Sequence, residues 1–300
     1  MRDKCMQLCF LVCVLLLGSV AARGGNSLDP MQHQAALVMK DLYHFRFEDA
    51  DKKIQEMKLT AGTHYLPHLM RSHYYWWRLI SQEMDDQSSR NYLESLSLAQ
   101  QASQVLLRQG QPSFTDVFHL INLYALKARL DVLNGEYVRA IRHMKQCADF
   151  LKVSLGQEAV FPDFNLTSGL YNYMTAYGSR RYPFLLVYAL MYPKGDMAKG
   201  KQQLQIAARS IDPVIKTEAH YFLMKILQEI EQDYAGALTY SSWLTQQYPG
   251  NLIFLYHHIT LLQKVDDTRQ LHTLRNHFLR ELQYNDQLTA RQRLYLQSLL

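Results

Sequence analysis

The chain has 300 residues, of which 48% are hydrophobic and 20% are charged, and its formal net charge is +5. This composition excludes a disordered chain, because the apolar side chains are numerous enough to form a large core. The basic excess is small, and its largest clusters are the pairs Lys52-Lys53 and Arg180-Arg181. Nucleic-acid binding needs a concentrated basic surface, so we expect no nucleic-acid partner.

Residues 1–22 have the pattern of a cleavable signal peptide. Arg2 and Lys4 form a short positive region, Cys5 to Gly18 is apolar, and Val20-Ala21-Ala22 supplies the small residues that signal peptidase recognises. The alternative is an uncleaved anchor, but the apolar run is shorter than the roughly 20 residues that a spanning helix needs. We therefore expect an exported protein, periplasmic or secreted, without a transmembrane segment after cleavage.

Cysteine usage fits an exported protein that is stabilised by its core. Cys5, Cys9 and Cys13 lie in the predicted signal peptide, and only Cys147 remains after cleavage. A single cysteine cannot form an internal disulfide, and Cys147 is predicted to be a buried, inert thiol. Residues 23–32 are predicted to be a short linker, and residues 33–300 one helical domain.

A short motif recurs through this domain: an aromatic or large apolar residue, two variable positions, a small residue, and then an amphipathic helix. The small residue allows two antiparallel helices to approach closely, so each copy predicts a helical hairpin. Strand signals are absent, and the predicted fold class is all-α. The copies begin at Phe47 (with Ala50), Tyr92 (with Ser95), Tyr137 (with Ala140), Met197 (with Gly200) and Tyr234 (with Ala237), and a degraded sixth copy is expected near Thr268.

The segments Glu136-Tyr137-x-x-Ala140-Ile141 and Asp233-Tyr234-x-x-Ala237-Leu238, the latter followed by Tyr248-Pro249-Gly250-Asn251, resemble tetratricopeptide repeats. This resemblance covers most of residues 33–300, although the spacing in the first half departs from the 34 residues of that family. It implies a right-handed α-α solenoid of helical hairpins.

A narrower resemblance rests on Phe161-Pro162-Asp163, Gly169 to Tyr173, Lys194 to Leu204 and Thr217-Glu218-Ala219, together with the turn at Tyr248. In these segments the chain is similar to exported tetratricopeptide-like proteins of the Bacteroidota type, and more distantly to the inclusion-body-clearance tetratricopeptide family. The resemblance implies a fold and a bacterial periplasm, without implying an activity.

An aromatic-rich insert at 161–192 interrupts the repeat and is the first candidate binding surface. Its candidate binding residues are Tyr171, Tyr173, Tyr177, Arg180 and Arg181, because tyrosine provides contact area together with a hydrogen-bonding hydroxyl. The alternative is that these rings pad a long helix against its neighbours.

Trp76, in the run Tyr74-Tyr75-Trp76-Trp77, is a further candidate. It either faces the concave groove of the solenoid, where such folds bind peptides, or belongs to the core.

Catalytic and metal-binding patterns are missing from the sequence. No histidine pair has a third ligand at metal spacing, and there is no Gly-x-Ser-x-Gly motif or phosphate-binding loop. We therefore expect no metal, no cofactor and no enzyme activity, and predict a scaffold that binds a protein or peptide. The alternative is a helical-repeat protein that binds a glycan or small ligand, and an enzyme ranks third. The last helix either caps the solenoid or forms a homo-oligomer.

Overall fold

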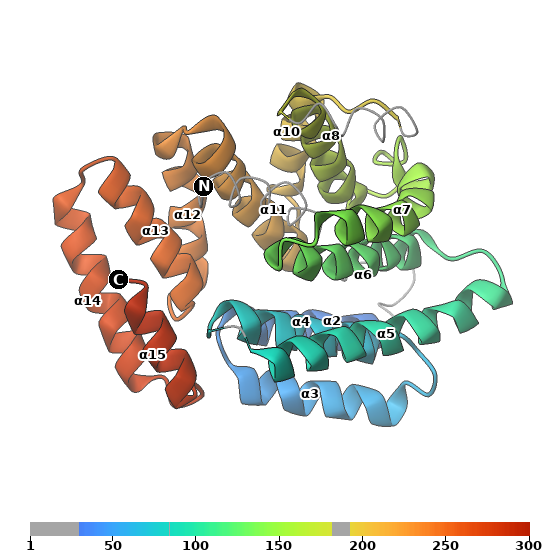
Figure 1. The fold of residues 1–300 in the computed structure, drawn as a ribbon, viewed down its shortest axis with the longest axis horizontal. Coiled ribbons are helices and arrows are strands. Elements are labelled where there is room, and N and C mark those ends of the chain that lie inside the picture. The colour runs from blue at the N-terminus through green and yellow to red at the C-terminus, as the bar shows by residue number, and fades with distance from the viewer. Residues whose placement is uncertain (1–29, 84, 182–192) are drawn as a thin grey trace. The chain divides into compact units, whose positions relative to one another are not determined.

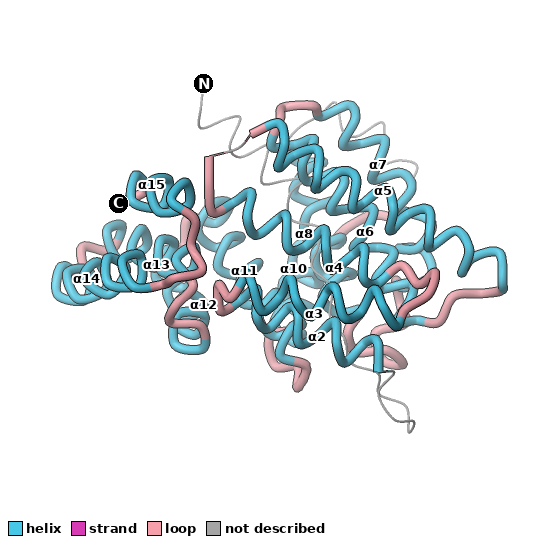
Figure 2. Tube along the Cα trace, turned by 90° about the horizontal axis from the view of Figure 1, so that it is seen from below, coloured by secondary structure: helices cyan, strands magenta, loops and turns pink. Residues whose placement is uncertain are grey.

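The computed structural model describes residues 30–83, 85–181 and 193–300. The predicted signal peptide at 1–22 and residues 182–192 of the insert lie outside this part. Within it, all regular structure is helical, as the tube in Figure 2 shows, so the predicted all-α class is confirmed. None of the helices in these ranges is long and apolar enough to cross a membrane.

The chain divides into two compact units. The central unit, Leu107–Leu223, is continuous, whereas the discontinuous unit combines Leu28–Leu106 with Met224–Leu300. The labels of Figure 1 are used for the helices. The central unit holds α6 (Phe114–Leu133), α7 (Tyr137–Ser154), α8 (Phe164–Arg181), α10 (Met197–Ala207) and most of α11 (Pro213–Lys225). The discontinuous unit holds α2 (Pro30–Tyr43), α3 (Phe47–Thr60), α4 (Leu66–Ile80), most of α5 (Asp86–Gln109), the π-helical η2 (Ile226–Glu231), α12 (Tyr234–Gln247), α13 (Leu252–Lys264), α14 (Thr268–Tyr284) and α15 (Ala290–Ser298). Helix α2 thus begins within the expected linker, three residues before the predicted start of the helical domain at residue 33.

The recurring motif marks the beginning of a helix in all but one copy. Its small residues are all buried. The exception is the copy at Tyr92, because α5 already begins at Asp86. There Asp85 accepts a hydrogen bond from the Ser88 backbone N–H at 2.7 Å and starts the helix earlier. The other copies begin α3, α7, α10, α12 and, in the degraded form, α14.

The same tight turn precedes four of these helices. A residue with left-handed backbone stands two positions before the helix in each case: Phe45 (φ 59°), Gly135 (φ 76°), Gln232 (φ 54°) and Asp266 (φ 57°). Only one of the four is glycine, although side chains other than glycine are strained in this region. The turns therefore share a left-handed residue at the same place before the helix, while differing in sequence.

Hydrogen bonds across these turns show the same repetition. The N–H of the residue that follows the left-handed position bonds to the carbonyl five residues earlier, as from Arg46 to Asp41 (3.0 Å) and from Asp267 to Leu262 (3.1 Å). The turn at Gln232 differs, since Asp233 N–H bonds to Leu227 O, six residues earlier, at 2.9 Å. The extra residue is absorbed by η2, because a π-helical turn holds one residue more than an α-helical turn.

Aromatic rings join the two chain segments of the discontinuous unit. Tyr43, at the end of α2, packs against Tyr248 and Phe254, with ring centroids 5.4 and 6.5 Å apart. Trp77 of α4 meets Phe254 edge-on at 5.7 Å. Ring pairs at such distances and angles are worth about 0.5–1.5 kcal/mol beyond the area that they bury. Helices α2 and α4 are thus packed against the hairpin formed by α12 and α13.

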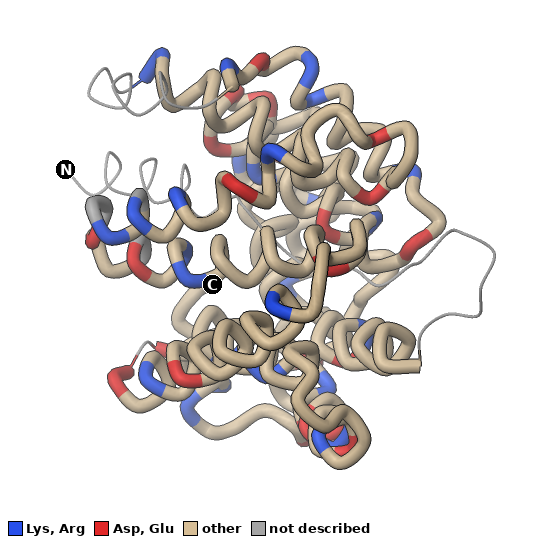
Figure 3. Tube along the Cα trace, turned by 90° about the vertical axis from the view of Figure 1, so that its right-hand side faces the viewer, with Lys and Arg blue, Asp and Glu red and all other residues tan. Residues whose placement is uncertain are grey.

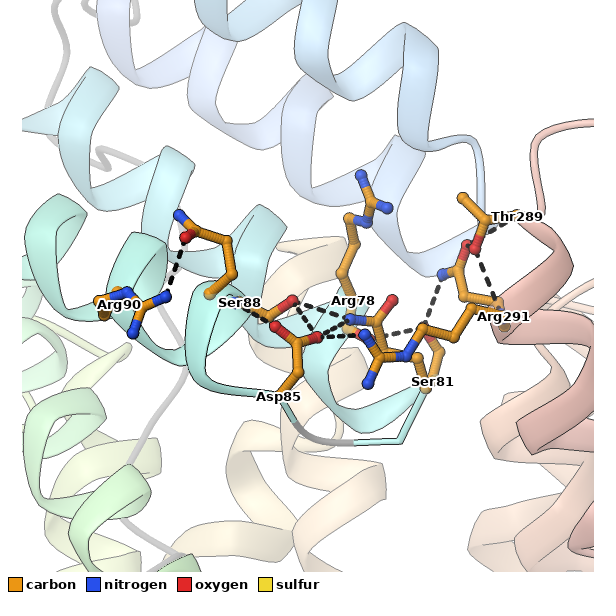
Figure 4. A network of polar contacts seen from close by, with 10 residues as sticks. Arg78, Ser81, Asp85, Ser88, Arg90, Thr289 and Arg291 are labelled. Atoms are coloured by element: carbon orange, nitrogen blue, oxygen red, sulfur yellow. Dashed lines mark hydrogen bonds and ion pairs between the residues drawn. The ribbon is translucent and has the colours of Figure 1, made fainter.

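A polar network joins the same two segments at α15 (Figure 4). Arg291 donates to Asp85 Oδ2 at 2.8 Å, and the side-chain amide of Gln292 donates to Ser81 Oγ at 2.8 Å. Gln292 also forms a capping box with Thr289, which fixes the beginning of α15. The helix that was expected to cap or to dimerise therefore contacts the loop between α4 and α5.

Candidate functional site

The structure places the candidate residues of the insert in two environments on α8. Tyr171 and Tyr173 are buried, with exposed fractions of 7% and 1%. Tyr177 is half-buried, and Arg180 and Arg181 are exposed at the end of the helix. Trp76 is buried in the discontinuous unit, where its ring lies 5.8 Å from that of Tyr92. Burial of these three rings agrees with the core-packing alternative, and the accessible part of the predicted set is Tyr177 with the two arginines.

Helices α8 and α10 touch through their backbones where Gly200 crosses α8. A Cβ atom at Gly200 would lie 2.5 Å from Tyr173 N and 2.6 Å from Gly169 O. Nearby, the Tyr171 hydroxyl donates to the Pro193 carbonyl at 2.6 Å. The tyrosines therefore stand at a close backbone contact between two helices of the central unit, which accounts for their burial.

A pocket of about 340 Å³ opens beside this helix pair, at the beginning of α8 and in the turn between α10 and α11. Its outer part is apolar, since Ile206 and Ile211 are 47% and 69% exposed. Its polar residues are Asp163, Asp212, Arg209 and Ser210. Exposed large apolar side chains beside buried charges are typical of a binding surface rather than of a solvated face. The remaining lining residues are Phe161, Pro162 and Ala207.

Asp212 is held by the beginning of α11. Its Oδ1 accepts hydrogen bonds from the backbone N–H groups of Val214 (2.7 Å) and Ile215 (3.0 Å), so it acts as the N-cap residue. The second oxygen, Oδ2, is buried and has no hydrogen-bond partner among the described residues. The residue as a whole is 3% exposed. A buried carboxylate oxygen without a donor is costly, and a ligand that brings a donor would remove that cost.

Asp163 is the second carboxyl of the pocket and immediately precedes α8. It is 8% exposed. Burial, and then the nearby charge of Asp212, raise the pKa of Asp163 to about 7. Burial also raises the pKa of Asp212 to about 6, against the opposing effect of its two backbone hydrogen bonds. The pair is therefore only partly ionised at neutral pH.

The local sequence indicates a helix start at Asp212 but does not show that the two aspartates are close. Asp212 precedes Pro213, and proline is common at the first position of a helix. The two aspartates are 49 residues apart in the chain and come together only because α8, α10 and α11 pack as they do. Within the described residues, no group of three or more His, Cys, Asp or Glu side chains could hold a metal ion.

Charged residues elsewhere are dispersed. Figure 3 shows lysines and arginines interspersed with aspartates and glutamates along the helices of the described chain. The pocket brings two buried acidic residues together.

Comparisons with known proteins assign no family: no family model, no curated protein and no solved structure matches this chain. Functional inference therefore depends on the site itself.

Proposed function

We propose that this protein is a non-catalytic, exported scaffold of the tetratricopeptide type, in which the pocket and its apolar rim in the central unit bind a protein or peptide partner. The observation that carries the proposal is the combination of exposed Ile206 and Ile211 with the buried pair Asp163 and Asp212. An apolar rim around a polar interior favours a ligand that has both kinds of group.

Three features support the tetratricopeptide-type architecture. Helices follow one another as hairpins, the small residue of each motif is buried, and the left-handed turn recurs with closely similar backbone geometry. A solenoid of such hairpins would present extended surfaces suited to peptides. Export and a periplasmic or secreted location rest on the pattern of residues 1–22.

Site-specific photo-cross-linking in native envelope extract tests the binding surface. A photoreactive residue at Ile211 is expected to capture a reproducible partner. The matched control is Leu59, which is 87% exposed in the discontinuous unit and should capture nothing reproducible. Capture that is equal at both positions, or absent at Ile211, would count against the proposed surface.

Binding of a glycan or small ligand is the second candidate, and half-buried Tyr177 is the residue that favours it. Loss of glycan-array binding in Tyr177→Ala would support it. Tyr171→Ala is unsuitable for this purpose, because it also removes a buried ring and the hydrogen bond to Pro193. Enzyme activity is the third candidate, and the paired carboxyls of Asp163 and Asp212 in the described pocket are the groups that would carry it.

A further inference from the structure

The pocket of Asp163 and Asp212 has a chemical preference that can be derived from its groups. Oδ2 of Asp212 requires a hydrogen-bond donor. A second carboxyl, Asp163, lines the same pocket. An anionic ligand would be repelled by both carboxyls. A neutral hydroxyl could satisfy Oδ2 but would leave the charge of the pair uncompensated.

We propose that this pocket receives one basic group on a short aliphatic stem, such as the ammonium end of a lysine side chain from the bound partner. The inference rests on the proposed function and specifies the part of the partner that enters the pocket. The same chemistry is present in a free alkylamine, so the test must separate these two sources.

The dimensions and the rim agree with such a group. A volume of about 340 Å³ lies at the small end of the range for ligand pockets, which suits a single side chain better than a folded segment. The aliphatic stem would contact Ile206 and Ile211 while its charged end reaches the carboxyls. Lysine binds in this way wherever its methylene groups lie along apolar surface.

Other charges around the pocket modulate this preference. Two helix N-termini, those of α8 and α11, meet the pocket and have a partial positive charge, and Asp212 offsets that of α11. Arg209 also lines the pocket, and its side chain is exposed. Because it repels another cation, Arg209→Ala is expected to strengthen binding slightly, by about twofold.

Binding of a cation should depend on pH. Since the pKa of Asp163 is about 7 and that of Asp212 about 6, both carboxyls become ionised as the pH rises from 5 to 8. Affinity for an ammonium group should rise across this interval, and proton release should accompany binding at pH 6.

The first experiment titrates the full-length purified protein with n-butylamine, n-butanol and butyrate, followed by nuclear magnetic resonance. Only the amine is expected to bind, with shifts confined to the pocket residues. Asp212→Asn keeps an oxygen that can accept from Val214 and Ile215 but removes the charge, so it should weaken binding at least tenfold. Asp163→Asn should also weaken amine binding at least tenfold. Asp196→Asn, at the exposed N-cap of α10, is the matched control and should bind like the wild type.

Equal binding of butanol and butylamine would overturn the proposal, as would failure of the amine to bind at millimolar concentration. Unchanged amine affinity in both folded aspartate variants would also overturn it. Circular dichroism establishes that each variant is folded before it is scored.

The second experiment repeats the cross-linking at Ile211 in the Asp163→Asn background. Loss of the captured partner supports entry of a basic side chain from that partner. Unchanged capture overturns the role of the pocket in partner binding while leaving the proposed scaffold function intact. If butylamine binds but the photoreactive residue at Ile211 captures nothing, the preference for an amine is supported and the natural ligand is a free amine. In that case only the proposed scaffold function is overturned.

Discussion

The side-chain amide of Asn251 donates a hydrogen bond to the backbone carbonyl of Tyr43 at 2.9 Å, although 208 residues separate them in the chain. The carbonyl oxygen of the same side chain accepts from the backbone N–H groups of Ile253 and Phe254, both at 3.1 Å. Asn251 is completely buried. One residue therefore both begins α13 and joins it to the end of α2.

Replacement of Asn251 separates these two roles. Asn251→Asp keeps the cap but loses the donor to Tyr43, and we expect a loss of at least about 1–3 kcal/mol, because a buried carbonyl is left unsatisfied and a charge is added. Asn251→Ala loses the cap as well, which costs about 1 kcal/mol on its own. Urea denaturation measures both variants. Stability within 0.5 kcal/mol of wild type in Asn251→Ala would contradict this account.

Gly200→Ala should destabilise the central unit by about 1–3 kcal/mol, because the new methyl group would meet the backbone of α8 at 2.5 Å. The direction of the change in stability is informative, because a glycine-to-alanine substitution at an open helix position stabilises a protein by up to about 1 kcal/mol. Lys199→Ala, at the exposed neighbouring position, is the control and should change stability by less than about 0.5 kcal/mol. Thermal unfolding followed by circular dichroism distinguishes these outcomes.

The left-handed turns predict opposite effects at two equivalent positions. Gln232→Gly should stabilise by about 0.5–1 kcal/mol, because the strain of a left-handed glutamine is relieved at a smaller entropic cost. Gly135→Ala should destabilise by about 1 kcal/mol. A Cβ at Gly135 would have nothing within 4 Å, so the effect would be purely conformational. Chemical denaturation of both variants tests whether the two positions correspond. A change in stability of the same direction in both variants would contradict this.

His258 should make the discontinuous unit sensitive to acid. Burial lowers the pKa of His258 to about 4, and its Nδ1 lies 2.6 Å from Ser241 Oγ. The unfolded chain takes up a proton near pH 6.5 but the folded chain does not, so stability is complete above that pH. It falls as the pH decreases towards 4, by roughly 3 kcal/mol in total.

The comparison of wild type with His258→Gln isolates this contribution. The stability difference between them should change with pH between 7 and 4.5, in favour of the variant at the acidic end. Ser241→Ala keeps the histidine, so the dependence of its stability on pH should be the same as in the wild type. Parallel curves for wild type and His258→Gln would show that another group is responsible.

The sequence predicts the helices well because their determinants are local. Apolar periodicity and the small residue of each motif identify the beginnings of α7 and α12 at Tyr137 and Tyr234, as the structure has them. The left-handed turns are less visible, since Phe45 and Gln232 give no indication of a positive φ. The extra residue in η2 is equally hidden, because a π-helical turn has no composition of its own.

The candidate site depends on relationships that a linear pattern does not contain. Tyrosine frequency indicates α8 as a binding element, but the contact between Gly169 and Gly200 turns Tyr171 and Tyr173 inward. Asp212 precedes Pro213 and is typical of a helix cap, whereas nothing in the local sequence distinguishes Asp163. Their shared pocket appears only after three helices have packed, so no spacing rule could have predicted it.

The discontinuous unit has a consequence for the order of events during synthesis. Its first segment leaves the ribosome long before Tyr248, Asn251 and Phe254 have been made, so the rings of Tyr43 and Trp77 then lack these C-terminal partners. The central unit needs no later segment and can fold first. Translation must be nearly finished before the opening helices reach their final packing, which leaves an apolar surface open to chaperones in the meantime.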